Sequence, residues 1–373
     1  CKKVMKIIHC ADLHLDSNMT SNLTKEKANE RKAELLATFE RMVTYAKNND
    51  IHIILIAGDL YDKKNISSTA RNVFISAVTN NPDITFYYLK GNHDAESLFM
   101  GMDKIPENIR LFGREWTNYK LEPDRDGNRI VISGVELTYD NSDLIYNSLV
   151  LDNNCFNIVM LHGQEADIRS RDKYENISLR FLRNKGIDYL ALGHIHSYKK
   201  ETLDARGIYC YSGCLEGRGF DECGEHGFVV LDVKDNRLVS HELIPIASRC
   251  LYEVEVDISE CMNSSEIVNN IRTVLDTKNY SSSSMIKVVL AGNTDVNCEK
   301  NIDYITMMFH DEYYYFKLYD HSGIRIDYDS FMNDSSIKGE FVRLVKADDI
   351  IDEDTKAAVI SIGINALAGE DYI

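Results

Sequence analysis

Five short polar clusters in this sequence combine aspartate, histidine and asparagine at spacings that suit metal-ion chemistry. The potential ligands among them are Asp12, His14, Asp59, Asn92, His162, His194 and His196. Carboxylate, amide and imidazole ligands, with no thiolate, form the mixture that holds two divalent cations around one phosphoryl group. In two of the clusters the ligands stand at positions i and i+2, which project to the same side of an extended backbone. The clusters therefore predict a two-metal centre for phosphoester hydrolysis.

The ligand types also narrow the choice of metal. Imidazole together with carboxylate and amide favours manganese, iron or zinc over magnesium and excludes a site for soft metals. We expect two divalent ions, with manganese as the first choice and iron or zinc as alternatives. Such a pair supports a mechanism in which hydroxide attacks phosphorus in line. The nine cysteines form no C-x-x-C pair, so neither a zinc knuckle nor a disulfide framework is indicated.

Each cluster follows a short apolar run that is rich in branched or aromatic residues. These runs, which are predicted to be buried strands, cover residues 4–11, 51–57, 84–89, 157–161 and 188–192. Apolar residues at helical spacing predict helices over residues 25–47 and 69–78. Parallel strands bring their carboxyl ends to one edge of a sheet, so the five clusters are expected to meet there.

The pattern of elements predicts an α/β protein with two domains. Residues 1–246 favour two sheets packed face to face with helices outside, which is a four-layer α/β/β/α sandwich. The strands expected late in this part, at 207–211, 227–233 and 238–243, are predicted to form a meander. Residues 247–373 predict a small α/β capping domain that ends in helices at 337–345 and 354–367.

Charge is distributed unevenly along the 373 residues, whose net charge is −17. Residues 1–246 hold 31 basic and 36 acidic residues, whereas residues 247–373 hold 11 and 23. A field this negative opposes a polyanionic ligand, so any contact with nucleic acid needs local basic patches or bound cations. The candidates for such a patch are Arg169, Arg171 and Lys173. These side chains could bind backbone phosphates, or they could be ordinary solvated charges.

The stretches around the clusters resemble the calcineurin-like metallophosphoesterase superfamily. Within it, residues 9–17, 57–62 and 192–196 are similar to the nuclease subunit of the bacterial SbcCD complex and its YhaO-type relatives. The core likeness covers residues 5–245, and that of the capping domain extends only to its general layout. One residue departs from the archaeal and eukaryotic double-strand-break nucleases, which carry histidine where this chain has Asp62.

The resemblance implies a role for each ligand. Asp12, His14, Asp59 and His196 would hold the first metal ion, with Asp59 bridging to the second. Asn92, His162 and His194 would hold that second ion. His93 would be the imidazole that is not a ligand and that protonates the leaving oxygen or steadies the phosphorus, and Asp94 would orient it.

The resemblance also implies a function: hydrolysis of DNA phosphodiester bonds in repair, as an SbcD-like exonuclease or endonuclease subunit. A homodimer beside an SMC-like coiled-coil ATPase of the SbcC type is implied, with the last helices either binding that partner or packing on their own domain. The alternative is a phosphatase or phosphodiesterase of small phosphate esters or nucleotides, which the acidic charge favours. No apolar run reaches the roughly 20 residues of a membrane span, so we expect a cytoplasmic protein without membrane contact.

Overall fold

The computed structural model describes residues 4–19, 23–62, 66–94, 104–122, 127, 129–166, 175–296 and 298–368. The chain forms two compact units, residues 1–248 and residues 249–373. All seven predicted metal ligands lie in the first unit. None of the helices formed by the described residues is both long and apolar enough to cross a membrane.

The first unit contains two six-stranded sheets. The first sheet has the order β14-β13-β1-β2-β3-β4. Its strands are β1 (Met5–Cys10), β2 (Ile53–Ala57), β3 (Thr85–Leu89), β4 (Ile109–Leu111), β13 (Gly227–Lys234) and β14 (Arg237–Pro245). The strands β1 to β4 are parallel, and β13 and β14 add an antiparallel hairpin beside β1. The loops after β1, β2 and β3 therefore share one edge of the sheet.

The second sheet has the order β11-β12-β10-β7-β6-β5. Its strands are β5 (Thr117–Lys120), β6 (Ile130–Gly134), β7 (Phe156–His162), β10 (Tyr189–Gly193), β11 (Lys199–Thr202) and β12 (Ile208–Tyr211). The central four are parallel, and the two outer strands are antiparallel to their neighbours. A short pair, β8 (Gln164–Glu165) and β9 (Asn176–Ile177), follows the end of β7.

The meander predicted for the strands after residue 207 is wrong. The strand β12 lies in the second sheet, parallel to β10, whereas β13 and β14 belong to the first sheet. The hairpin itself is locally encoded, because Asp235 and Asn236 both adopt positive φ angles, 51° and 57°, as a two-residue turn between twisted strands requires. The hairpin joins the first sheet because the free edge of β1 pairs with β13 and not with β12.

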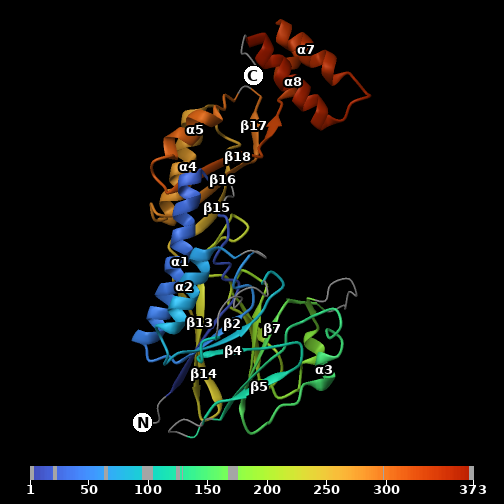
Figure 1. The fold of residues 1–373 in the computed structure, drawn as a ribbon. Helices are drawn as coiled ribbons and strands as arrows, with labels where there is room; N and C mark the ends of the chain where they lie inside the picture. The colour runs from blue at the N-terminus through green and yellow to red at the C-terminus, as the bar shows by residue number, and fades with distance from the viewer. Residues whose placement is uncertain are drawn as a thin grey trace. The chain divides into compact units, whose positions relative to one another are not determined.

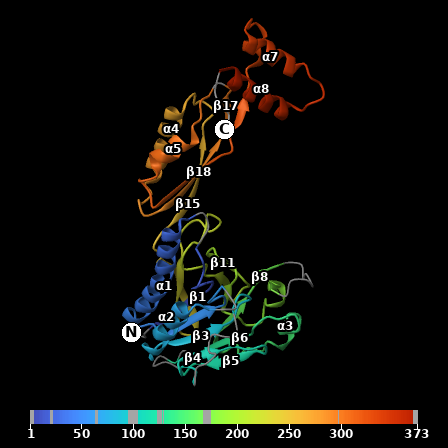
Figure 2. The ribbon, with the colours of Figure 1, turned by 45° about the horizontal axis from the view of Figure 1, so that its top comes forward.

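Alternating side chains divide the core of the first unit into layers. In β2, Ile54 and Ile56 pack against helices, while Leu55 faces the second sheet. The helices on this outer face are α1 (Lys25–Asn48) and α2 (Ser68–Thr79), begun by side-chain caps from Thr24 and Ser67. The opposite outer face is covered more thinly, by the one-turn helix α3 (Ile145–Ser148) and the 3₁₀ turn at Leu179–Phe181. Figures 1 and 2 show α1 and α2 on one side and α3 on the other, which confirms the α/β/β/α sandwich.

The second unit is a smaller α/β structure. Its sheet contains β15 (Leu251–Asp257), β16 (Met285–Ala291) and β18 (Tyr315–Asp320), all parallel. The helices α4 (Ser264–Lys278) and α5 (Ile302–Phe309) cover one face of it (Figure 2). The short strands β17 (Asn293–Asp295) and β19 (Gly323–Arg325) lead to three last helices. These are α6 (Tyr328–Met332), α7 (Ile337–Lys346) and α8 (Glu353–Ala368), with a small core of their own.

Candidate two-metal site

The structure brings all seven predicted metal ligands together. They lie on the loops or at the strand ends that follow β1, β2 and β3 in the first sheet and β7 and β10 in the second. Asp12, His14 and His196 each offer one ligand atom, and these atoms lie within 4.8 Å of one another. The Nε2 atoms of His14 and His196 face each other at 3.3 Å. Two imidazole nitrogens aimed at one point suit a shared cation.

A second group of ligands lies beside the first. Ligand atoms of Asp12, Asp59 and His162 also lie within 4.8 Å of one another. Oδ2 of Asp59 is 3.3 Å from Nε2 of His162 and 3.9 Å from Nε2 of His14. The carboxylate of Asp59 thus stands between one ligand of each group. Oδ1 of Asn92 is 3.0 Å from Nε2 of His162, which adds an amide oxygen to the second group.

His194 joins the second group through its ring and its backbone. Its ring is edge-on to that of His162, with centroids 5.5 Å apart. Its backbone N–H donates to both carboxylate oxygens of Asp12, at 2.9 and 3.0 Å. This bond ties the loop after β10 in the second sheet to the loop after β1 in the first. One ligand therefore fixes the backbone that carries another.

The backbone at the site is strained where ligands are presented. Asp12, His14, Asp59 and His194 all have positive φ angles, of 52°, 42°, 51° and 102°. This region is unfavourable for residues other than glycine and costs on the order of 1–3 kcal/mol at each position. Hydrogen bonds hold the strained loops in place, since the N–H groups of Asp12 and His14 donate to the carbonyls of Gly58 and Asp59, each at 3.0 Å. Such strain is typical of functional sites.

The ring of His162 is oriented by close packing. Its Nδ1 lies 2.9 Å from the carbonyl oxygen of Ala57, so Nε2 is directed toward Asp59. Gly58, with φ of +96°, lies so close that a Cβ there would collide with the imidazole. Burial would lower the pKa of His162, but the charge of Asp59 and a hydrogen bond to it raise the pKa to about 9. The surroundings of this ring therefore favour a positive charge, and a metal cation could take the place of the proton.

Two residues that sequence reasoning did not identify support His196. Oε1 of Glu222 lies 2.6 Å from Nδ1 of His196, on the ring side opposite the ligand atom. Arg218 donates to Glu222 from its backbone N–H and from Nη2, at 2.7 and 3.0 Å. Burial would raise the pKa of Glu222, but the bonds from His196 and Arg218 hold it below its usual range. A carboxylate behind a metal-binding histidine fixes the ring and raises its basicity as a ligand.

The loop that carries Arg218 and Glu222 is anchored to helix α1. Arg31, which is buried, donates to Oε2 of Glu216 at 3.0 Å and to the carbonyl oxygen of Gly217 at 2.8 Å. No motif of the sequence singles out these side chains. The bond to Glu216 comes from a helix residue 185 positions earlier in the chain.

His93 and its neighbours complete the site, with one correction. The ring of His93 is half exposed and edge-on to that of His14, with centroids 5.7 Å apart. Asp94 was expected to orient this ring. Its carboxylate instead accepts the N–H groups of Tyr61 and Gly91, both at 2.9 Å, and so holds the loop. The carboxylate near His93 is that of Asp62, whose Oδ1 lies 3.8 Å from Nδ1 of His93.

Asp62 lies inside the site, beside the rings of His14 and His93. Its Oδ1 is 3.1 Å from Nδ1 of His14, and its Oδ2 is 3.8 Å from Nη1 of Arg218. This close contact with His14 holds the pKa of Asp62 low, at about 2, although burial opposes this. The predicted phosphate-binding residues Arg169, Arg171 and Lys173 lie outside the described residues, so their role stays a prediction.

Comparison with known proteins agrees with this architecture. The profile of the calcineurin-like phosphoesterase family matches residues 5–198. The chain is 28% identical over 299 residues to the uncharacterized metallophosphoesterase YhaO of Bacillus subtilis, covering 77% of this chain and 72% of that protein. It is 24% identical over 294 residues to the DNA double-strand break repair protein Mre11 of Saccharolobus solfataricus, covering 73% and 70%. The match spans most of the sandwich and its ligand loops, and the chain therefore belongs to the calcineurin-like phosphoesterase family.

Proposed function

We propose that this protein hydrolyses phosphodiester bonds in DNA as the nuclease subunit of a repair complex. The observation that carries the proposal is the convergence of seven oxygen and nitrogen ligands from two sheets onto one small volume. That volume has the ligand types of a two-metal phosphoesterase. The similarity to Mre11 proteins, which are named for DNA double-strand break repair, supports DNA as the substrate.

The donor set fits a pair of divalent cations. Asp12 and Asp59 are buried carboxylates, and buried negative charge without a compensating cation is costly. With imidazole nitrogens on both sides, the site suits manganese first, with iron or zinc as alternatives. Asp12, His14, Asp59 and His196 would hold one ion, and Asp59, Asn92, His162 and His194 the other. When bound, the two ions supply a nucleophile from water at neutral pH and neutralise charge on the phosphoryl oxygens.

A side chain of the protein then protonates the leaving group. His93 is half exposed at the rim of the ligand cluster, where it can donate a proton to the leaving oxygen. Oδ1 of Asp62 lies 3.8 Å from Nδ1 of His93, so a carboxylate stands beside the proton donor. Arg218 in turn contacts both Asp62 and Glu222, so one guanidinium links the proton donor's carboxylate to the support of His196.

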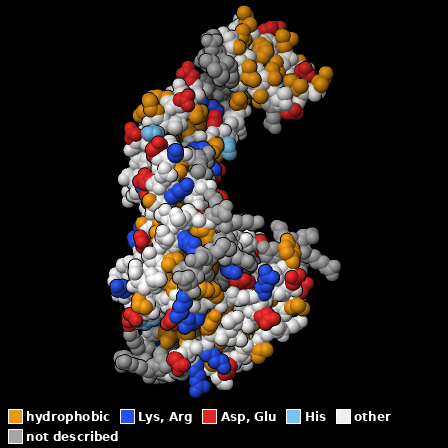
Figure 3. Space-filling view, in the orientation of Figure 1, with side chains coloured by type: hydrophobic (Ala, Val, Ile, Leu, Met, Phe, Trp, Pro, Cys, Tyr) orange, Lys and Arg blue, Asp and Glu red, His pale blue; other side chains and the backbone are white. Residues whose placement is uncertain are grey.

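We further propose that residues 1–246 are the nuclease core and that residues 247–373 are a capping domain whose last helices bind a partner. In α8, Ile360 and Ile364 are buried in the local core, whereas Ile362 is exposed. Ile337 and Leu344 of α7 are exposed as well, and Figure 3 shows apolar side chains gathered over these helices. Such a surface suits a coiled-coil ATPase of the SMC type. A cytoplasmic homodimer beside that ATPase is the assembly we propose.

A direct comparison of substrates tests the proposal. Labelled duplex and single-stranded DNA and small phosphate monoesters and diesters are incubated with the protein and manganese, and then again with a chelator. We expect DNA cleavage that stops with the chelator and is absent from the Asp59→Asn variant. Cleavage of small esters alone would contradict the nuclease proposal and establish the alternative, which the net charge of −17 favours.

A further inference from the structure

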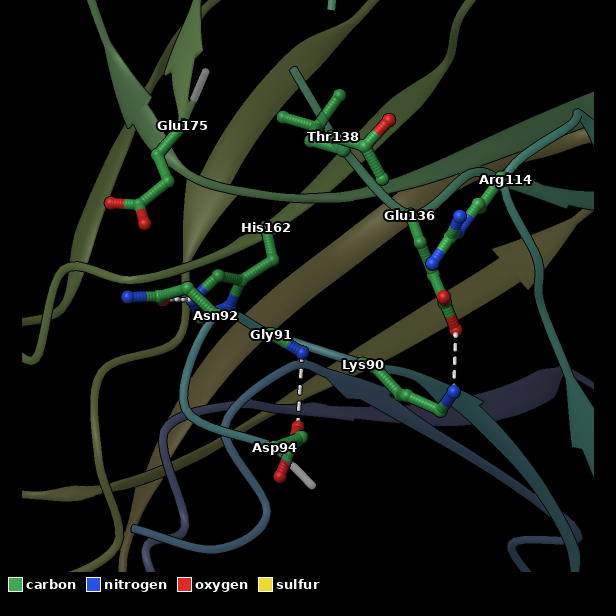
Figure 4. Close-up of a pocket in the computed structure, with 10 residues that line it drawn as sticks. Lys90, Gly91, Asn92, Asp94, Arg114, Glu136, Thr138, His162 and Glu175 are labelled. Atoms are coloured by element: carbon green, nitrogen blue, oxygen red, sulfur yellow. Dashed lines mark hydrogen bonds and ion pairs between the residues drawn. The ribbon is translucent and has the colours of Figure 1, made fainter. Parts of the chain in front are cut away.

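A pocket of about 160 Å³ opens beside the second group of metal ligands. Asn92 and His162, two of the predicted ligands, form part of its wall. Besides Asp94, which holds the loop after β3, its other polar side chains, drawn in Figure 4, are Lys90, Arg114, Glu136, Thr138 and Glu175. None of these five is needed to hold a metal ion or to donate a proton in the proposed reaction. The proposed reaction therefore does not explain these side chains.

The wall residues come from the same sheet edges as the metal ligands. Lys90 follows β3 in the first sheet, and Arg114 lies between β4 and β5. Glu136 and Thr138 follow β6 in the second sheet, and Glu175 precedes β9. The pocket thus adjoins the place where a phosphoryl group would lie between two cations. An ester group on that phosphorus can extend into it.

A single asparagine holds two segments of the wall together. The side-chain amide of Asn141 donates to the carbonyl oxygens of Arg114 and Glu136, both at 2.8 Å. Its Oδ1 accepts the backbone N–H of Thr138, also at 2.8 Å. The N–H of Glu136 donates to the carbonyl oxygen of Gly113 at 2.8 Å. A wall fixed in this way loses little conformational freedom when a ligand binds, which favours binding.

Carboxylates outnumber the basic side chains around the pocket. Lys90 and Arg114 are the two basic residues of its wall, and Asp94, Glu136 and Glu175 are the three acidic ones. Nζ of Lys90 lies 3.7 Å from Oε1 of Glu136 (Figure 4). A second phosphate would meet three carboxylates and no net attraction. A neutral ligand that both donates and accepts hydrogen bonds, such as a sugar with its base, matches this wall.

The size of the pocket restricts the ligand further. Its volume of about 160 Å³ is below the roughly 300–1,000 Å³ of pockets that enclose a whole drug-sized molecule. One unstacked nucleoside can place its base or sugar there, whereas a base-paired duplex end cannot enter. Enzymes that act on one nucleotide of a duplex commonly take it out of the stack, at a cost that is smallest for an unpaired end.

We infer that this pocket binds the single unstacked nucleoside next to the scissile phosphate, with Arg114 and Glu136 as residues that select it. The inference rests on the proposed function, because it takes the metal pair as the place of hydrolysis. It adds a substrate preference that the metal ligands do not explain: a phosphodiester with a free nucleoside should be a better substrate than one without.

Two chromogenic diesters test the inference with the metal-loaded protein. Bis(p-nitrophenyl) phosphate carries no nucleoside, and thymidine 5′-(p-nitrophenyl phosphate) carries one; both release p-nitrophenolate. We expect Arg114→Ala and Asn141→Asp to lower kcat/KM for the thymidine ester about tenfold and to leave the other ester unchanged, since only the first makes hydrogen bonds to the wall. Arg110→Ala, an exposed arginine on β4 outside the pocket, is the matched control and should change neither rate.

The outcomes separate the inference from the proposed function. An equal loss on both esters, or no loss on the thymidine ester, overturns the inference. If the wild type hydrolyses neither ester, the DNA cleavage assay still decides the proposed function, and calorimetry with thymidine 5′-monophosphate and manganese tests the pocket by itself. A Kd raised about tenfold by Arg114→Ala supports the inference, whereas equal affinities or no binding overturn it.

Discussion

Oε1 of Glu222 lies 2.6 Å from Nδ1 of His196, and this contact places a buried carboxylate directly behind a predicted metal ligand. Removing the negative charge should weaken the ligand without removing it. We expect Glu222→Gln to lower the affinity for one of two manganese ions about 10- to 100-fold, as for other partners of metal-binding histidines. Calorimetric titration with manganese measures this. Glu225→Gln, an exposed neighbour, is the control, and equal affinities in the two variants would contradict the role of Glu222.

His93 should act in the reaction and not in metal binding. Its ring is half exposed and is the one imidazole of the five motifs without an assigned metal. We expect His93→Ala to reduce kcat about 10²- to 10⁴-fold, the usual contribution of a general acid. The metal content, measured by elemental analysis, should stay at two ions per chain. A variant that retains the full rate, or loses an ion, would show that the assignment is wrong.

Gly58 should tolerate no side chain. Its φ of +96° is strained for any other residue, and a Cβ would collide with the ring of His162. We expect Gly58→Ala to displace the ring, to abolish binding of one metal ion and to reduce hydrolysis to background. Gly113→Ala is the control, because a Cβ there meets no atom within 4 Å. Crystal structures of both variants with manganese would show whether the ring moves.

Removing one partner of the buried ion pair between Arg31 and Glu216 should destabilise the fold more than removing both. Removing Arg31 leaves the buried Glu216 carboxylate with Arg41, 3.8 Å away, as its cation, so Arg31→Met should lower the free energy of unfolding by about 3 kcal/mol, the low end for a broken buried pair. Urea denaturation measures the change. The double variant Arg31→Met, Glu216→Gln should recover part of the loss, and a double variant less stable than the single one would contradict this account.

His9 should make the protein sensitive to acid. It is buried between the sheets, with Nδ1 2.9 Å from the hydroxyl of Tyr189, and burial lowers its pKa to about 3. The unfolded chain takes up this proton near pH 6.5, so the stabilisation is complete above that pH and is lost as the pH falls toward 3.

Between pH 7 and pH 5 the loss from His9 should be about 2 kcal/mol. Urea denaturation of the wild type and of His9→Gln at both pH values measures it, and the variant should lose correspondingly less stability on acidification. His52→Gln, an exposed histidine of the same unit, should behave like the wild type. The same pH dependence in His9→Gln would exclude His9 as the cause.

Local patterns in the sequence were sufficient for the elements and for the chemistry of the ligands. Apolar alternation and helical spacing depend on neighbouring residues, so β1, β2, β3, α1 and α2 could be predicted within a few positions. The motif residues could be recognised by type, since a metal centre constrains the ligand atoms themselves. Such patterns do not show which distant segment packs against each strand or helix.

The tertiary structure decided everything that depends on contacts between distant segments. It assigned β12 and β13 to different sheets, because the open edge of β1 selects its neighbour by hydrogen bonding and not by hydrophobic pattern. It placed Glu222 behind His196 and moved Asp94 from the histidine ring to the loop backbone. A side chain's type shows what it can bind, but its position in the folded chain determines which groups lie within reach.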